Sequence, residues 1–490
     1  MKQMAFALAF AGLLIAGESG ASPLERGATP IQFTVHPETT YQTIQGFGAG
    51  FNGIAEDLVN TIRSEYQAKA YDLLYGESGV QLNIIRLTVS PAANPILNEP
   101  HHGWDWAHDE GTQQELAAIR PILKMHSGKA ALLDPKLILY AVPFTPPPYW
   151  KAGASPQNPL SGGSLKPENY QAYAEYLTSF LLYFHEQGAD IDVLSIQNEP
   201  GMASGWASCV WTGEEMHKFL KVLAPMVRAH GLATKIMLSE GTNWTGAWEH
   251  LMPSLSDPAT AEFAEVLASH SYEIPKSADP FVDPGRDKFR QAWEETGKPV
   301  WMSEMSLMQP RQEDDPSINA ALKIARYIHL DMTQARASAW IYCFAIFKTY
   351  PFPKQPQQQI GSMGVLSPSD QSEGRLVVPK RLWAIANYSR FARPGWKLMD
   401  IEGPNYEHTG FVSSDGKSFA IVAVNPMDSR VRPISVHYGF GARSVRDVEA
   451  HVTSATQDLA SVPVHGAGPH GFTAELPPQS ITTFSGGLVP

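Results

Sequence analysis

Cysteine and basic residues are scarce in this sequence of 490 residues. It contains only two cysteines, Cys209 and Cys343. A disulfide framework is therefore excluded, and the sequence leaves open whether these two form a single bridge. Lys and Arg total 37 against 49 Asp and Glu, which gives a net charge of −12. No segment is dense enough in positive charge to follow a phosphate backbone, so no nucleic-acid partner is expected.

Long hydrophobic runs are also missing. One short apolar run covers residues 4–16, after Lys2 and shortly before the small residues Ser19 and Ala21. It is too short to span a bilayer, but a charged start, a short apolar stretch and a small-x-small site are typical of an export signal. We therefore expect residues 1–21 to be removed and the protein to be secreted, extracellular or periplasmic, without a membrane span.

Several motifs that would indicate other chemistry are absent. No Gly-x-Ser-x-Gly elbow and no His-Glu-x-x-His pair occurs, and His101-His102 does not have the spacing of metal ligands. The glycines at 46, 48 and 50 lack the later glycine of a dinucleotide fingerprint. No repeat of 20–50 residues is visible, which argues against a solenoid or propeller. Neither a metal nor a cofactor is therefore expected.

What the sequence does contain is a regular alternation of short β-branched runs, loops and amphipathic stretches. Asn169–Gln187 has helical periodicity, and Thr212 with Glu215 has the spacing of a capping box at the start of another helix. Eight strands are predicted: Thr43–Phe47, Asn83–Val89, Lys136–Val142, Val193–Gln197, Lys235–Ser239, Val266–His270, Pro299–Ser303 and Ala339–Phe344. Eight strands with intervening helices predict an α/β fold, a (β/α)₈ TIM barrel over residues 45–391.

The pattern changes after about Phe391. Short strands are predicted at Ser418–Val424, Val431–His437, Ser444–His451 and Ile481–Phe484. Residues 392–490 therefore predict a side β-sandwich domain. The segment 31–44, before the barrel, is extended in character and is expected to add a strand to that domain.

Two acidic residues close predicted strands. Glu199 follows Val193-Leu194-Ser195-Ile196 in the run Gln197-Asn198-Glu199-Pro200, and Glu304 ends the run Trp301-Met302-Ser303-Glu304. In the predicted count these are strands four and seven, whose ends can face each other across the mouth of a barrel. Two facing carboxylates can split a glycosidic bond, one as acid and the other as nucleophile or base. The alternative is that both are solvated loop acids.

With these residues in place, the chain resembles glycoside hydrolase family 30. The resembling stretches are Gln45–Phe51, Ile85–Leu87, Thr145–Lys151, Gln197–Pro200, Ser269–Tyr272, Trp301–Glu304 and Leu476–Phe484. They occur in order over nearly the whole mature chain. The resemblance implies a barrel with a side β-domain built from both chain ends, and a polysaccharide or oligosaccharide as substrate. It also implies that Glu199 is the acid/base and Glu304 the nucleophile of a retaining mechanism.

The resemblance extends to residues around the two carboxylates. Asn198 is expected to bind the sugar 2-hydroxyl, Arg86 to lie beside Glu304 and keep it ionised, and Tyr272 to donate to Glu304. His270 either lines the site or is a core histidine. Indole rings stack on sugar faces, and candidates in or after strands are Trp150, Trp206, Trp211, Trp244 and Trp340. Trp340 is the first choice for the sugar floor, and Trp150 is also expected to bind substrate.

The substrate is less well determined than the reaction. The stretch Tyr170–Gly201 and the ending Leu476–Phe484 are most similar to the bacterial xylanase branch, so an endo-acting enzyme on β-1,4-xylan is predicted. The glucuronoxylan-specific members carry arginines after the eighth strand, whereas here Ile341–Lys348 has only Lys348. Strict dependence on glucuronate is therefore not expected. A β-1,6-galactanase, a β-1,6-glucanase, a glucosylceramidase and a non-catalytic carbohydrate-binding protein stay open, as does the oligomeric state.

Overall fold

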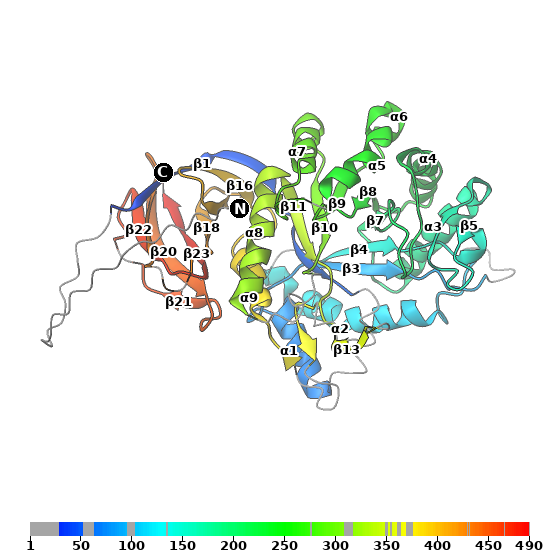
Figure 1. Ribbon diagram of the computed structural model, residues 1–490, viewed down its shortest axis with the longest axis horizontal. Coiled ribbons are helices and arrows are strands. Elements are labelled where there is room, and N and C mark those ends of the chain that lie inside the picture. The colour runs from blue at the N-terminus through cyan, green and yellow to red at the C-terminus, as the bar shows by residue number, and fades with distance from the viewer. Residues whose placement is uncertain are drawn as a thin grey trace, which may run out of the picture.

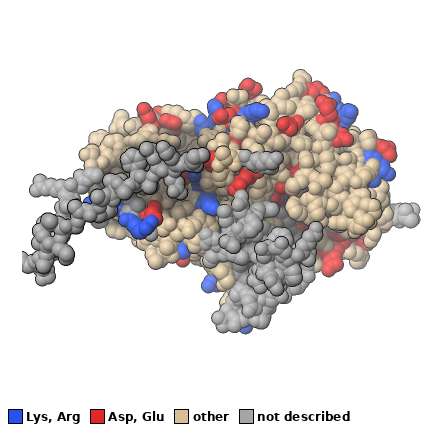
Figure 2. All heavy atoms as spheres, in the orientation of Figure 1, with Lys and Arg blue, Asp and Glu red and all other residues tan. Residues whose placement is uncertain are grey.

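The computed structural model describes residues 29–51, 63–95, 103–133, 136–274, 277–307, 317–347, 351–352, 355–359, 364–368, 376–428, 430, 432–464 and 466–489. The predicted export signal and Lys348 lie outside these residues. Among the described residues, no helix combines the length and the apolar character needed to cross a membrane. On the face of the molecule that Figure 2 shows, acidic side chains are scattered, with basic ones between them.

Eight parallel strands close into a barrel, as predicted. Around the ring they are β2 (Gly46–Gly50), β3 (Ile84–Val89), β4 (Ile138–Pro143), β7 (Val193–Ser195), β8 (Lys235–Gly241), β9 (Val266–His270), β10 (Val300–Met305) and β11 (Ala337–Tyr342). Side chains such as Ile84, Tyr140 and Trp301 fill the interior. The barrel is thus a packed core, and its open end is formed by the loops that follow the strands.

Helices surround the barrel (Figure 1). They are α1 (Ser64–Tyr75), α2 (Glu110–Leu133), α3 (Tyr170–Glu186), α4 (Gly213–Ala229), α5 (Trp244–Ser256), α6 (Pro258–Ala261), α7 (Gly285–Thr296), α8 (Ile318–Gln334) and α9 (Lys380–Ser389). The capping box at the start of α4 is confirmed, because the Thr212 side chain accepts from the Glu215 amide and the Glu215 carboxylate accepts from the Thr212 amide. Two short hairpins, β12 (Pro351–Phe352) with β13 (Gln355–Gln359) and β14 (Ser367–Pro368) with β15 (Leu376–Val377), follow β11.

Outside the barrel, the described residues near the two chain ends form one continuous sheet of nine strands. Their order is β21 (Ala460–Val462), β20 (Ser444–Thr453), β23 (Ser480–Val489), β18 (Ser418–Asn425), β17 (Glu407–Val412), β16 (Lys397–Glu402), β1 (Ile31–Thr43), β19 (Ile434–Gly439) and β22 (Gly471–Leu476). The N-terminal strand β1 pairs antiparallel with β16 and parallel with β19, so the sheet is mixed. Strands β20 and β22 come into contact, and the curled sheet encloses a second hydrophobic core.

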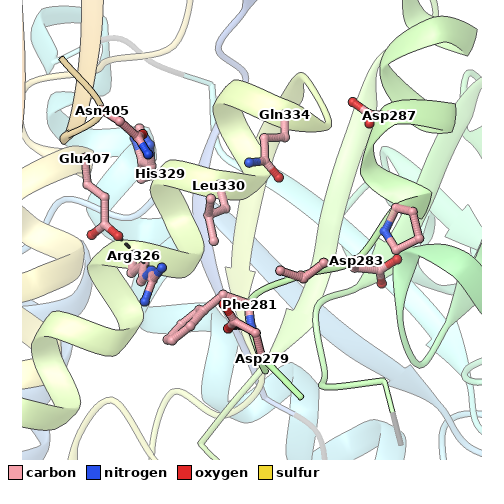
Figure 3. Close-up of a pocket in the computed structure, with 12 residues that line it drawn as sticks. Asp279, Phe281, Asp283, Asp287, Arg326, His329, Leu330, Gln334, Asn405 and Glu407 are labelled. Atoms are coloured by element: carbon pink, nitrogen blue, oxygen red, sulfur yellow. Dashed lines mark hydrogen bonds and ion pairs between the residues drawn. The ribbon is translucent and has the colours of Figure 1, made fainter. Parts of the chain in front are cut away.

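The side sheet packs along α8 and α9 (Figure 1). Asn387 on α9 donates to the Thr453 hydroxyl at 2.7 Å and accepts from Thr483 at 2.9 Å. Nearby, a hollow of about 630 Å³ lies where α8, the loop before α7 and the turn between β16 and β17 meet (Figure 3). In it, Arg326 of α8 makes an ion pair with Glu407 of the sheet at 2.7 Å. Barrel and sheet are therefore joined by polar contacts as well as by packing.

Candidate active site

The two predicted carboxylates meet at the mouth of the barrel. An oxygen of Glu199, an oxygen of Glu304 and a ring nitrogen of His270 all lie within 4.8 Å of one another. Both carboxylates are largely buried, with 7% and 6% of their residue surface exposed. These two residues are 105 positions apart in the chain, and the barrel brings them together because strand ends of a closed parallel ring share one rim.

Local irregularities turn the carboxylates toward the mouth. Trp301 points into the barrel, so strict alternation along β10 would point Glu304 outward. The register between β9 and β10 shifts between Met302 and Glu304, which breaks the alternation. Glu199 has a φ of 46°, in the left-handed region that costs a non-glycine residue energy. Strained backbone of this kind is typical of functional sites.

The charge of Glu304 is held by Arg86 and Tyr272. The Arg86 Nη1 atom lies 2.7 Å from Glu304 Oε2, and the Tyr272 hydroxyl donates to Oε1 at 2.7 Å. Burial by itself would raise the pKa of the Glu304 carboxyl, but Arg86, His270 and the Tyr272 hydrogen bond together hold it below its usual value. Glu304 is therefore ionised at neutral pH, and both predicted contacts to it are present.

Arg86 also fixes the orientation of Asn198. Its Nη2 atom donates to Asn198 Oδ1 at 2.6 Å. Because a guanidinium can only donate, the amide oxygen must face Arg86, and the Asn198 Nδ2 group is directed elsewhere. Asn198 thus presents a donor next to Glu199.

A third buried carboxylate, Glu240, was not among the sequence candidates. Its side chain is fully buried, and its Oε1 accepts from the Tyr140 hydroxyl and lies 3.8 Å from Arg86 Nη2. The prediction ends the fifth strand at Ser239, two residues before β8 ends at Gly241. The sequence does contain a signal for Glu240, because it is an acidic residue at the end of the fifth barrel strand. The same placement at a strand end identified Glu199 and Glu304. Glu240 also has a left-handed φ, of 55°.

His270 lies between the carboxylates, which decides the question that the sequence left open. Its Nδ1 is 3.3 Å from Glu199 Oε1, and its Nε2 is 3.7 Å from Glu240 Oε1. Burial favours the neutral ring, but Glu304 and the hydrogen bonds with Glu199 and Glu240 raise the pKa of His270 to about 9. Burial would raise the pKa of Glu240, but its hydrogen bond with His270 and the charges of Arg86 and His270 lower that pKa to about 2.

The proximity of Glu199, His270 and Glu304 also raises the question of a metal ion. A protonated imidazole has no lone pair to offer a cation, and Glu304 is already neutralised by Arg86. The donor set therefore fits a proton-transfer site better than a metal centre.

The prediction that Trp340 forms the sugar floor is wrong. Ala339 and Ile341 point into the barrel, so Trp340 points outward toward the helices. Its side chain is fully buried, and its indole nitrogen donates to Asp331 of α8 at 3.0 Å. Trp150 is partly exposed and packs edge to face against Trp104 and Tyr176. Its predicted contact with substrate stays a prediction.

The loops around the site are tied together by buried polar groups. The Lys151 ammonium is buried and donates to the Thr145 hydroxyl at 2.8 Å and to the carbonyls of Leu160 and Ser208 at 3.0 and 2.9 Å. Gln197, just before Asn198, donates to the Phe144 carbonyl and accepts from the Trp211 indole. The loops after β4 and β7 are therefore one connected structure.

Two further features lie at or beyond this rim. Cys209 and Cys343 are both free and buried, so the structure contains no bridge between them. The hollow of Figure 3 is lined mainly by α8 and the loop before α7, with residues of the side sheet, and none of the three buried carboxylates lines it. It is a separate feature of the surface.

Comparison with known proteins relates the chain to one family of glycosidases. The sequence model of O-Glycosyl hydrolase family 30 matches residues 138–354, which include both Glu199 and Glu304. Glucuronoxylanase XynC of Bacillus subtilis (strain 168) is 25% identical over 353 residues, covering 71% of this chain and 73% of its own. Putative glucosylceramidase 3 of Caenorhabditis elegans is 27% identical over 256 residues, 49% of this chain and 48% of its own.

A solved structure is similar over almost the whole chain. The glycoside hydrolase family 30 subfamily 8 xylanase Xyn30A from Clostridium acetobutylicum aligns with a TM-score of 0.69 and 25% identity. The alignment covers 93% of this chain and 99% of that one, so barrel and side sheet are shared.

Proposed function

Because the chain belongs to glycoside hydrolase family 30, we propose that it is a retaining endo-β-glycosidase that hydrolyses β-1,4-xylan. One observation carries the reaction type: oxygens of Glu199 and Glu304 lie within 4.8 Å of each other. Retaining enzymes hold their carboxyl groups about 5–5.5 Å apart, whereas inverting enzymes need roughly 6.5–9.5 Å to admit a water. The observed separation supports a direct attack by one carboxylate.

In the first step Glu304 attacks the anomeric carbon and Glu199 gives its proton to the leaving oxygen. The bond from carbon to the leaving oxygen breaks, and an ester to Glu304 forms. In the second step Glu199, now ionised, takes a proton from water. The water oxygen then displaces Glu304 from the same carbon, which regenerates both carboxyl groups and retains the configuration.

The neighbouring residues suit these roles. Arg86 and Tyr272 keep Glu304 ionised and orient one of its oxygens. Asn198, whose oxygen is held by Arg86, offers its Nδ2 group to the sugar 2-hydroxyl, a contact that strengthens in the transition state. His270 carries a proton beside Glu199 and stabilises the negative charge that this carboxylate acquires after the first step.

The choice of xylan is supported by the relatives, which include glucuronoxylanase XynC and xylanase Xyn30A. We further propose that unbranched xylan is accepted, because Ile341–Phe347 contains no arginine. Export is proposed from residues 1–21, whose pattern is that of a cleaved signal.

A product profile tests the substrate. The purified protein is incubated with unbranched xylan, glucuronoxylan, β-1,6-galactan and β-1,6-glucan, and the products are mapped. We expect xylo-oligosaccharides from both xylans, first released with the β configuration when followed by proton NMR. Activity on a β-1,6-linked glucan or galactan with none on xylan would reject the substrate, and initial release of the α anomer would reject the retaining mechanism.

The variant Glu304→Gln separates an enzyme from a carbohydrate-binding protein. It keeps the shape of the side chain but removes the attacking charge, so turnover on xylan falls about 10⁴-fold or more while binding persists. Glu249→Gln, at an exposed position of α5, serves as the matched control and keeps full activity. A wild-type protein that binds xylan without cleaving it would identify a binding protein instead.

A further inference from the structure

All but one of the tryptophans of this protein are packed in or against a hydrophobic core. All twelve tryptophans are among the described residues, and eleven of them lie in a hydrophobic core or pack against one. Trp206 does not, and half of its surface is exposed. It makes no ring contact with any other described aromatic residue. A tryptophan left out of the core offers a large, flat apolar face to a ligand, and tryptophan is enriched where proteins bind their partners.

Trp206 stands on the loop that carries the proposed acid/base. The amide of Trp211 donates to the carbonyl of Pro200 at 2.8 Å, so residues 200–211 form a closed loop that starts directly after Glu199. Trp206 follows Glu199 by seven positions, and a chain of that length spans at most about 25 Å even when extended. The indole therefore lies within a few sugar rings of the carboxylate.

The backbone that carries Trp206 is held in place on both sides. The carbonyl of Ser204 accepts from the Ser161 hydroxyl, that of Gly205 from Asn158 Nδ2 at 3.2 Å, and that of Trp206 from the Ser208 hydroxyl at 3.2 Å. Ser161 and Asn158 lie between β5 (Lys151–Ala154) and β6 (Gly162–Leu165), the hairpin that follows β4. An exposed ring on a firmly held backbone loses little entropy when it binds a ligand.

The neighbouring loop presents a second exposed aromatic ring. Tyr149 lies two positions before β5, the first strand of the β5–β6 hairpin, and has 57% of its surface exposed. Two of the three most exposed aromatic residues in the described part of the chain thus belong to the connected loops after β4 and β7. The third, Tyr406, is on the side sheet.

We propose that Trp206 is a stacking platform for the part of a β-linked glycan that extends from the scissile bond on the leaving-group side. This inference rests on the proposed function, since that side is the one on which Glu199 protonates the leaving oxygen. We take the occupant to be the glycan because the loop that carries Trp206 begins directly after Glu199. The part of the glycan that extends beyond Glu199 must pass over the rim of the barrel mouth at this loop. An indole offers the flat apolar face that the C–H face of a sugar ring needs.

The kinetic test compares substrates with and without sugars on the leaving-group side. Trp206→Ala lowers kcat/KM on xylohexaose about tenfold, mainly through KM, the usual cost of truncating a tryptophan that anchors a ligand. Activity on an aryl β-xylobioside, which has no sugar beyond the scissile bond, stays within about twofold of wild type. Trp206→Phe recovers most of the loss, and the control Tyr406→Ala changes neither activity. Equal losses on both substrates, or none on either, would overturn the proposal.

A binding test keeps this proposal separate from the proposed reaction. In the Glu304→Gln background, migration of the protein through native gels containing soluble xylan or β-1,6-glucan is compared with and without Trp206→Ala. If a glycan retards the Glu304→Gln protein but no longer retards the protein that also carries Trp206→Ala, the result supports the role of Trp206 in stacking. This holds even if the wild type never cleaves xylan. Unchanged retardation by that glycan, or no retardation of the parent by either glycan, would contradict it.

Discussion

The candidate active site is a cluster of buried charges in which every charged side chain depends on its neighbours. Arg86, fully buried, faces both Glu304 and Glu240, while His270 faces Glu199, Glu240 and Glu304. Charges taken out of water are tolerated only when they are paired, so each substitution here affects the protonation of the others.

Replacing Arg86 by lysine tests its hold on the nucleophile. Lysine keeps the charge but cannot serve Glu304 and Asn198 at once with a planar fork. We expect kcat/KM on xylan to fall about 30-fold or more, the effect of about 2 kcal/mol. Because Arg86 lowers the pKa of Glu304, weakening it raises that pKa, and the acidic limb of the pH–rate profile moves to higher pH. Arg290→Lys, in an exposed ion pair of α7, is the control and leaves the profile unchanged. An acidic limb that does not move would contradict the assigned role.

The variant Glu240→Gln tests the residue that sequence reasoning missed. It removes one of the charges that raise the pKa of His270 to about 9. We therefore expect NMR of labelled histidine to show a lower pKa for His270 in the variant than in the wild type. The buried network also loses a charged hydrogen bond, and the free energy of unfolding in urea drops by about 1–3 kcal/mol. If the pKa of His270 is the same in the variant as in the wild type, the contact with Glu240 does not determine the protonation of His270.

For individual residues, the sequence predicts the position along a strand but not the direction in which the side chain points. Trp340 lies in the eighth strand, as predicted. Because Ala339 and Ile341 point into the barrel, the Trp340 side chain points to the helices. Glu304 would point the same way by simple alternation, and only the register shift before it turns it to the mouth. A displacement of one residue reverses the face, so direction depends on local geometry that no pattern in the sequence records.

At the scale of helices, strands and loops, the eight barrel strands were found where the sequence placed them, with ends shifted by a few residues. Strands β16, β17, β21 and β22 of the side sheet are not predicted from the sequence. Segments such as Glu407–Val412 combine charged and small residues and carry weak strand propensity by themselves. Their conformation is determined by pairing with neighbouring strands in the sheet.

The connection between the loops after β4 and β7 depends on Lys151. Replacing it by methionine removes the side-chain donor from the buried Ser208 carbonyl and one of the two donors from the Leu160 carbonyl, which keeps the Ser208 amide. We expect a loss of about 1–3 kcal/mol in unfolding free energy and faster limited proteolysis between residues 155 and 208. Lys218→Met, at an exposed position of α4, is the control. Unchanged proteolysis would show that the loops are held mainly by their packing.

At the scale of the whole molecule, barrel and side sheet share an interface that contains neutral histidines. His329 of α8 lies 2.9 Å from the Thr409 hydroxyl of β17. Burial, with the nearby charge of Arg326, lowers the pKa of His329 to about 4, and burial with His329 lowers that of His408 to about 3. The charged forms are therefore disfavoured where the two parts meet.

This interface predicts a loss of stability in acid. A histidine with a lowered folded-state pKa leaves stability intact above its unfolded value of about 6.5, because neither state is then protonated. As pH falls from 6.5 towards 4 only the unfolded state gains a proton, so the unfolding free energy drops by about 3 kcal/mol for His329. His329→Gln should flatten the decline of Tm over this range, while His230→Gln, exposed at the end of α4, should not. Parallel curves for wild type and His329→Gln would contradict this account.

The amino-acid sequence alone determined the barrel, the presence of a β domain that includes the N-terminal strand, and the two facing glutamates. Each of these follows from periodicity and from residues at strand ends, which are local properties of the chain. The tertiary structure decided which side chains meet at the mouth: Glu240 joins the cluster, His270 lies between three carboxylates, Trp340 faces the helices and Trp206 alone is left without a core to pack into. These outcomes depend on strand register and on contacts between residues far apart in the chain, and such contacts exist only once the barrel has closed.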